Sequence, residues 1–178
     1  TITLGVAKML RHYLEQAGAI VYLTREEDVD LADDDLGKGV SRKSQDIRRR
    51  LKFIHDQEAD LFLSIHLNSL PSPRWRGAQT FYYPSLPENK QLATFIQEEI
   101  ILNLENTSRA PLQLNQVYLL KHAKVPGALV ELGFLSNEEE RELLKQGKYQ
   151  KKLAISLYRG SLRYIETPVS EEDELERM

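Results

Sequence analysis

Two short apolar runs, each ending in an ionisable residue, constrain the fold of this chain more than any other feature. Leu61–Ile65 leads into His66, and Ala128–Val130 leads into Glu131. Short apolar runs of this kind are typical of buried strands in sheets covered on both faces. Since ligands bind at the carboxyl ends of strands in open α/β sheets, the histidine and the glutamate are candidates for one shared site. Imidazole together with carboxylate is typical of zinc hydrolases.

Helical and strand patterns alternate along the rest of the chain. The apolar periodicity and the turn residues predict helices over residues 2–14, 46–57, 87–100, 138–144 and 149–165, strands over 19–23, 59–66, 77–83, 117–120 and 128–131, and a long surface loop over 25–44. This alternation predicts an α/β fold, a single three-layer domain with a mainly parallel or mixed sheet and helices on both faces.

Composition limits the domain count and the partners. A chain of 178 residues with 41% hydrophobic content forms one domain, which we expect over residues 1–166, followed by an acidic, mobile tail over 167–178. The net charge of −3, with both signs mixed along the chain, argues against nucleic acid as a partner. Cysteine is absent, which excludes disulfides and thiolate-bound metals. The sequence contains no apolar run of membrane-spanning length and no visible export signal.

Each ionisable residue also has a simpler interpretation. His66 could be a hydrogen-bonded core residue rather than a metal ligand, and Asn68 could orient it or cap the turn. Burial of an ionised Glu131 is costly without a cation or donors, so a metal, a protonated base or an arginine ion pair would each explain it. The acidic residues in 26–35 lack the spacing of a calcium loop, which favours a solvated face.

Joined together, these segments resemble the zinc-dependent N-acetylmuramoyl-L-alanine amidases of bacterial cell walls, of the Amidase_3 type. The resemblance covers nearly the whole chain and rests on Thr24-Arg25, Arg50 and the segments 59–68, 77–81 and 126–137. Segments 72–84 and 115–122 further resemble the sporulation and germination-specific branch, whose members strip stem peptides so that muramic lactam forms in the spore cortex.

The resemblance implies a zinc ion held by a histidine, a glutamate and a second histidine. His66 corresponds to the second histidine, whereas the family's first strand, first histidine and glutamate would precede the helix at the start of this chain. Since His12, His55 and His122 do not match the missing motif, we expect an incomplete site and a chain that is inactive by itself. Glu131 corresponds to the catalytic carboxylate, which takes a proton from the attacking water and passes it to the departing amine.

The implied reaction is zinc-dependent hydrolysis of the amide between the lactyl group of N-acetylmuramic acid and L-alanine. Asn68, Trp75 and Arg50 are candidates for binding peptidoglycan, although Trp75 could instead pin its loop and Arg50 could form a structural ion pair. The implied location is extracytoplasmic, in the cell wall or spore cortex, and an activating protein partner is left open.

Two other functions compete with this one. The alternative is a non-catalytic peptidoglycan-binding or regulatory domain that retains the amidase fold. A serine hydrolase using Ser64 with His66 is disfavoured, because residues two apart on one strand do not form a nucleophile elbow.

Overall fold

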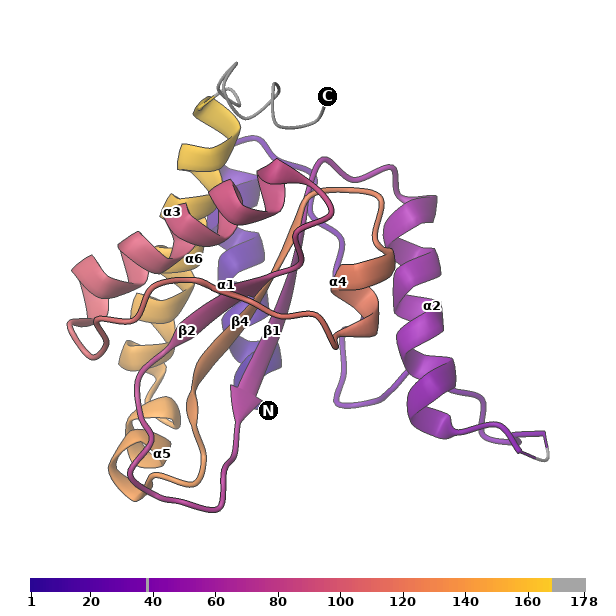
Figure 1. Cartoon of the computed structure of the whole chain (residues 1–178), viewed down its shortest axis with the longest axis horizontal. Coiled ribbons are helices and arrows are strands. Elements are labelled where there is room, and N and C mark those ends of the chain that lie inside the picture. The colour runs from indigo at the N-terminus through magenta and orange to yellow at the C-terminus, as the bar shows by residue number, and fades with distance from the viewer. Residues whose placement is uncertain (38, 168–178) are drawn as a thin grey trace.

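The computed structural model describes residues 1–37 and 39–167. Figure 1 shows helices packed around a central twisted sheet. The elements are α1 (Ile2–Gln16), α2 (Arg42–Asp56), β1 (Phe62–Asn68), β2 (Gln79–Tyr82), α3 (Pro87–Leu104), β3 (Leu112–Gln113), α4 (Tyr118–His122), β4 (Gly127–Phe134), α5 (Glu138–Leu144) and α6 (Gly147–Glu166). The acidic tail expected over 167–178 lies, apart from Thr167, outside the described residues.

The sheet is mixed, with strand order β1-β4-β2-β3. β4 pairs in parallel with β1 on one side and antiparallel with β2 on the other, and β3 runs parallel to β2. A parallel β1–β4 pair places the carboxyl ends of both strands at the same edge, where the sequence predicted the site.

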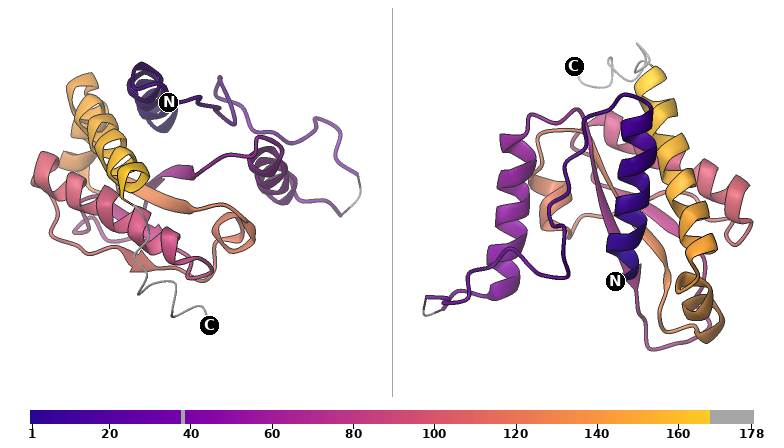
Figure 2. Two further views of the ribbon diagram at one scale, coloured as in Figure 1. Left: turned by 90° about the horizontal axis from the view of Figure 1, so that it is seen from above. Right: turned by 180° about the vertical axis from the view of Figure 1, so that it is seen from behind.

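Two apolar cores lie on opposite faces of the sheet. Ala128, Val130 and Leu132 of β4 pack against α1, α3 and α6. Leu129, on the other face, packs with residues of α2 and α4. Side chains alternate between the faces of a strand, so one strand serves both cores. Figure 2 shows α1 and α6 behind the sheet and α2 to one side, and these layers confirm the predicted α/β fold.

Two predicted strands are wrong. Residues 19–23 form no strand, and Ile20 is 82% exposed. An apolar run becomes a strand only where a neighbour supplies the ladder hydrogen bonds, and no described strand lies beside this segment. Residues 118–122 are helical rather than extended, because both Leu119 and Leu120 are buried against the second core, which a strand that alternates faces would not achieve.

Helix α2 begins at Arg42, four residues before the predicted start at Asp46. The Asp46 carboxylate does not cap the helix but accepts the backbone N–H of Leu31 at 2.8 Å, which fastens the preceding loop to α2. Among the described helices, none is both long and apolar enough to cross a bilayer.

Candidate active site

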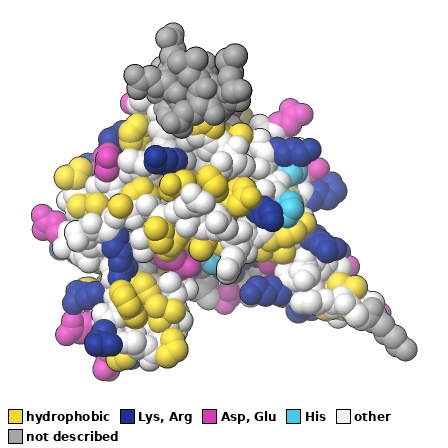
Figure 3. Space-filling model, in the orientation of Figure 1, with side chains coloured by type: hydrophobic (Ala, Val, Ile, Leu, Met, Phe, Trp, Pro, Cys, Tyr) yellow, Lys and Arg dark blue, Asp and Glu magenta, His cyan; other side chains and the backbone are white. Residues whose placement is uncertain are grey.

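Strand register brings the predicted catalytic and metal-binding residues together. Glu131 of β4 has two Cα partners in the sheet: His66 of β1 on one side and Gln79 of β2 on the other. Because Glu131 lies two residues after Leu129, its side chain points to the face covered by α2 and α4. Figure 3 agrees with this arrangement, because an acidic (magenta) patch and a histidine (cyan) patch adjoin near the middle of that face.

The Glu131 carboxyl group is partly buried and lacks the partners that ordinarily stabilise a carboxylate. Its Oε2 atom is buried with no hydrogen-bond partner among the described residues. No ion pair within the described parts of the chain includes it, so the arginine ion pair considered from the sequence is not formed. Burial raises the pKa of Glu131 to about 7. A carboxyl group with this pKa can both take and give a proton near neutral pH.

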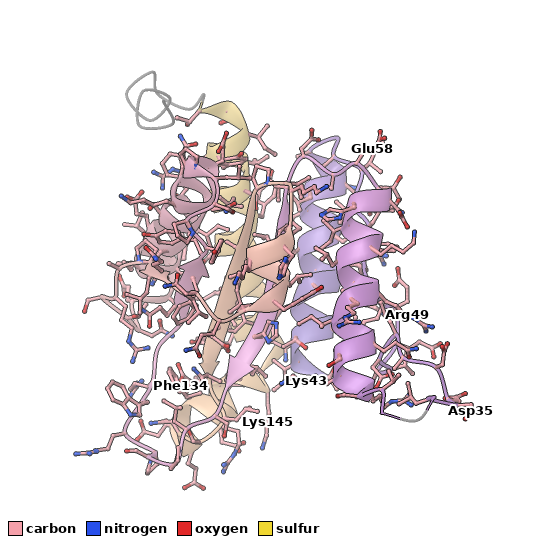
Figure 4. The ribbon with its side chains drawn as sticks, turned by 45° about the vertical axis from the view of Figure 1, so that its right-hand side comes forward. Asp35, Lys43, Arg49, Glu58, Phe134 and Lys145 are labelled. Atoms are coloured by element: carbon pink, nitrogen blue, oxygen red, sulfur yellow. The ribbon has the colours of Figure 1, made fainter. Side chains whose placement is uncertain are left out.

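His66 is exposed, and its Nε2 atom lies 2.9 Å from Ser64 Oγ. Partial desolvation lowers the pKa of His66, and the positive charges of Arg50 and Lys43 lower it further. Figure 4 shows Lys43, at the start of α2, beside the end of β1. A lowered pKa favours the neutral imidazole, which is the form that binds metals.

Arg50 takes part in a structural ion pair at the edge of this site. Its Nε atom lies 2.9 Å from Asp46 Oδ2, and its Nη1 donates to Thr24 Oγ1 at 2.6 Å. Burial alone would raise the pKa of the Asp46 carboxyl, but the hydrogen bonds from Arg50 and the Leu31 N–H outweigh burial and lower it. The ion pair with a neighbouring Asp that the sequence suggested for Arg50 is therefore formed, while the Arg50 charge also acts on His66.

Asn68 and Trp75 follow β1 at the same edge of the sheet. The Asn68 carbonyl accepts the N–H of Leu135 at 2.8 Å, which joins the ends of β1 and β4. Trp75 lies in the loop between β1 and β2 and is 52% exposed, with the Arg109 guanidinium over its ring. Substrate contact by Asn68, Trp75 and Arg50 stays a prediction.

Sequence reasoning missed Glu140 as a residue of the site's framework. Glu140 is 1% exposed, and its carboxylate accepts the N–H groups of Gly77 and Phe134, each at 2.7 Å. These two residues lie just before Gln79 and just after Glu131 in the chain. The helix cap formed by Asn137 on the Glu140 N–H was a readable signal, but the contact with Gly77, 63 residues away, was not.

The described residues do not by themselves complete a zinc site. Nowhere in residues 1–37 and 39–167 do three or more His, Asp or Glu side chains converge as metal ligands, whereas catalytic zinc normally takes three protein ligands. His66 has the right chemistry for one of them. The other histidines lie elsewhere: His12 contacts Tyr13, His55 accepts the Lys124 N–H, and His122 stacks on Tyr118.

Several carboxylates of the acidic loop that follows α1 form ion pairs with arginines. Asp30 pairs with Arg42, and Asp33 pairs with Arg49. These pairs support the interpretation of a solvated, charged face.

Comparisons with known proteins agree with this geometry. The sequence profile of the N-acetylmuramoyl-L-alanine amidase family Amidase_3 matches residues 1–162. The germination-specific N-acetylmuramoyl-L-alanine amidase of Bacillus subtilis (strain 168) is 50% identical over 165 residues, which are 92% of this chain and 69% of that protein. LytC, an N-acetylmuramoyl-L-alanine amidase of the same strain, is 29% identical over 165 residues, and the match spans only 30% of its length.

Solved structures lead to the same family. The structure of the CwlD amidase from Clostridioides difficile, in complex with the GerS lipoprotein, matches with a TM-score of 0.88 and 34% identity over 93% of this chain and 85% of that one. The family profile, the 50% identical relative and this structural match together show that the chain belongs to the Amidase_3 family of N-acetylmuramoyl-L-alanine amidases.

Proposed function

We propose that residues 1–166 form the catalytic domain of an enzyme that hydrolyses the amide between the lactyl group of N-acetylmuramic acid and L-alanine in peptidoglycan. The observation that carries this proposal is the registered pair of His66 and Glu131, with a partly buried carboxylate that forms no ion pair with an arginine in residues 1–37 and 39–167. Membership of an amidase family makes hydrolysis of this bond the reaction to test.

Glu131 acts in this proposal as the general base. It takes a proton from the attacking water and later delivers that proton to the departing amine of L-alanine. A pKa of about 7 suits both transfers, because the carboxyl group is readily ionised before the attack and readily protonated after it.

His66 acts as one ligand of a zinc ion in this proposal. The chemistry that zinc supplies when bound is polarisation of the lactyl carbonyl and activation of water. The described residues provide this single histidine at the site, so the proposal assigns the remaining ligands to residues outside those described.

The 50% identity to a germination-specific amidase supports a role in maturation of the spore cortex, through formation of muramic lactam. Such a substrate places the enzyme outside the cytoplasm, in the cell wall or cortex. The CwlD structure is a complex with the GerS lipoprotein, which supports the proposal that this enzyme binds a protein partner, and we propose that the partner activates it. Asn68, Trp75 and Arg50 are proposed to contact peptidoglycan.

One observation favours a second function. The lack of three converging ligands within the described residues would suit a peptidoglycan-binding or regulatory domain that retains the amidase fold without catalysis.

Zinc content and the release of stem peptides from purified peptidoglycan separate the two functions. We expect both to appear in a version of the chain extended upstream with the natural sequence, and neither in the chain alone. In the extended version, Glu131→Gln should abolish release but retain zinc. The control Glu15→Gln, at an exposed position on α1, should leave both unchanged. A folded extended chain without zinc or cleavage would favour the binding domain.

A further inference from the structure

The loop between β1 and β2, residues 69–78, is held in one conformation by the start of α5. Four contacts join this loop to residues 136–140: Leu70 N–H to Ser136 Oγ (3.2 Å), Asn137 Nδ2 to the Pro73 carbonyl (2.8 Å), Arg76 to Glu139 (3.2 Å) and Gly77 N–H to Glu140 (2.7 Å). The loop therefore needs no further side chain to pin it.

Gly77 allows a second segment to pack closely on the same loop. Its φ of +89° lies in the left-handed region, and a Cβ there would meet the Asn106 carbonyl oxygen at 2.7 Å. Arg109 Nη1 donates to the Gly77 carbonyl at 2.8 Å. Residues 106–109 and the start of α5 thus both contact the end of this loop.

Trp75 projects from this anchored loop with much of its side chain in solvent. It is 52% exposed, and the Arg109 guanidinium carbon lies 5.8 Å from its ring centroid and 5.3 Å from that of Phe134. A tryptophan that merely pins a loop would bury its ring, whereas this indole is backed by a cation and leaves apolar surface open. An exposed aromatic surface on a rigid support can bind a flat apolar face without loss of loop entropy.

A short chain of contacts links Trp75 to Glu131. Arg109, which lies over Trp75, is followed by Ala110, whose carbonyl accepts from Gln79 Nε2 at 3.1 Å. Gln79 is in turn the Cα partner of Glu131. Figure 4 shows Phe134, on the Trp75 side, and Lys43, at the start of α2, on opposite sides of the strand ends. Trp75, Phe134 and the Arg109 guanidinium over their rings thus lie on one side of the strand ends, and Lys43 lies on the other.

We propose that Trp75 stacks on a sugar ring of the glycan strand, so that the glycan lies on the β2 side of Glu131 and the stem peptide on the α2 side. This inference rests on the proposed function. The lactyl group joins the scissile amide directly to a sugar, so a pyranose must lie close to Glu131 during reaction. A pyranose offers an apolar C–H face to an indole, whereas a carboxylate of the stem peptide suits the positive charge of Lys43 beside the end of β1.

Tryptophan fluorescence tests the proposal independently of catalysis, because Trp75 is the single tryptophan of this sequence. The 178-residue chain and the version extended upstream are each titrated with oligomers of N-acetylglucosamine and N-acetylmuramic acid that lack stem peptides, and separately with free stem peptide. We expect a saturable change in emission with the glycan oligomers and none with the peptide. Trp75→Phe serves as the emission blank.

Kinetics on peptidoglycan provide the second measurement. Trp75→Ala should raise KM roughly three- to ten-fold with little change in kcat, and Trp75→Phe should restore most of the affinity because it keeps an aromatic face. Tyr22→Ala is the matched control, because Tyr22 is 55% exposed and lies outside this loop, and it should leave KM unchanged.

The outcomes separate this proposal from the proposed function. An emission change with the stem peptide but not with the glycan, or an unchanged KM in Trp75→Ala, overturns the sugar platform even if the enzyme cleaves peptidoglycan. A glycan-dependent emission change in a protein that releases no stem peptide supports the platform and removes the hydrolytic function.

Discussion

At the scale of single residues, the Glu131 carboxyl should make stability depend on pH. Its folded pKa of about 7 lies above the ordinary value of 4.5. The folded state therefore binds more protons than the unfolded chain between these two values, so its stability falls as pH rises through this window and changes no further above it. In metal-free buffer, we expect Glu131→Gln to remove this loss and to be about 1–3 kcal/mol more stable than the wild type at pH 8.

Urea unfolding at pH 4 and pH 8 measures this effect. The advantage of Glu131→Gln should be small at pH 4, where the wild-type carboxyl is protonated in both states, and Glu15→Gln should show no advantage at either pH. An equal effect of Glu131→Gln at both pH values would mean that the carboxyl is not desolvated in the folded chain.

Single residues also show how far the sequence alone could predict the site. His66 and Glu131 could be found because each ends an apolar run, and the rule for ligand sites at strand ends brings them to one edge. Gln79 and Glu140 could not. Their roles depend on an antiparallel register between β2 and β4 and on a contact between residues 63 apart, and neither leaves a periodic signal in the sequence.

At the scale of elements, Glu140 of α5 joins the end of β4 to the segment before β2 through two hydrogen bonds. Removal of this carboxylate leaves the N–H groups of Gly77 and Phe134 without their acceptor in a buried setting. Each buried donor without a partner costs about 1–3 kcal/mol, so we expect Glu140→Ala to lower the free energy of unfolding by about 2–5 kcal/mol.

Glu139→Ala is the matched control for Glu140→Ala. Its side chain is 81% exposed and loses only a surface ion pair with Arg76, so the change should stay below about 1 kcal/mol. Chemical denaturation of both variants gives the comparison. Equal effects of the two substitutions would show that Glu140 does not hold the strand ends together.

The wrong predictions at this scale share a physical cause. Residues 19–23 and 117–120 are continuous apolar runs, and the secondary structure of so short a run depends on what packs beside it. Residues 118–122 are helical because the consecutive residues Leu119 and Leu120 are both buried. Residues 19–23 form no strand because no described strand lies beside them, and Ile20 and Tyr22 are exposed. Longer periodic segments such as α3 and α6 carried enough signal to be predicted with nearly correct bounds.

At the scale of the whole molecule, one apolar core joins α1, α3 and α6 to the sheet, so a defect in this core should destabilise the entire domain. Helices α3 and α6 approach each other closely at Gly160, where a Cβ would lie 2.5 Å from Ile96 Cα and 2.8 Å from its backbone nitrogen. Ile96 is fully buried and its backbone cannot move aside without shifting α3. We therefore expect Gly160→Ala to separate the two helices and lower the free energy of unfolding by about 1–3 kcal/mol, despite the better helix propensity of alanine.

Gly147→Ala on the same helix distinguishes packing from propensity. A Cβ at Gly147 meets no atom within 4 Å, so this substitution should be neutral or slightly stabilising. Thermal unfolding followed by circular dichroism and by the emission of Trp75 measures both variants. The same core includes Val130, next to Glu131, so the circular dichroism and Trp75 signals should change at the same temperature in each variant. That temperature should be lower in Gly160→Ala than in the wild type. Loss of the Trp75 signal well before the helical signal would instead mean that the edge of the sheet carrying the site unfolds independently of the helices behind it.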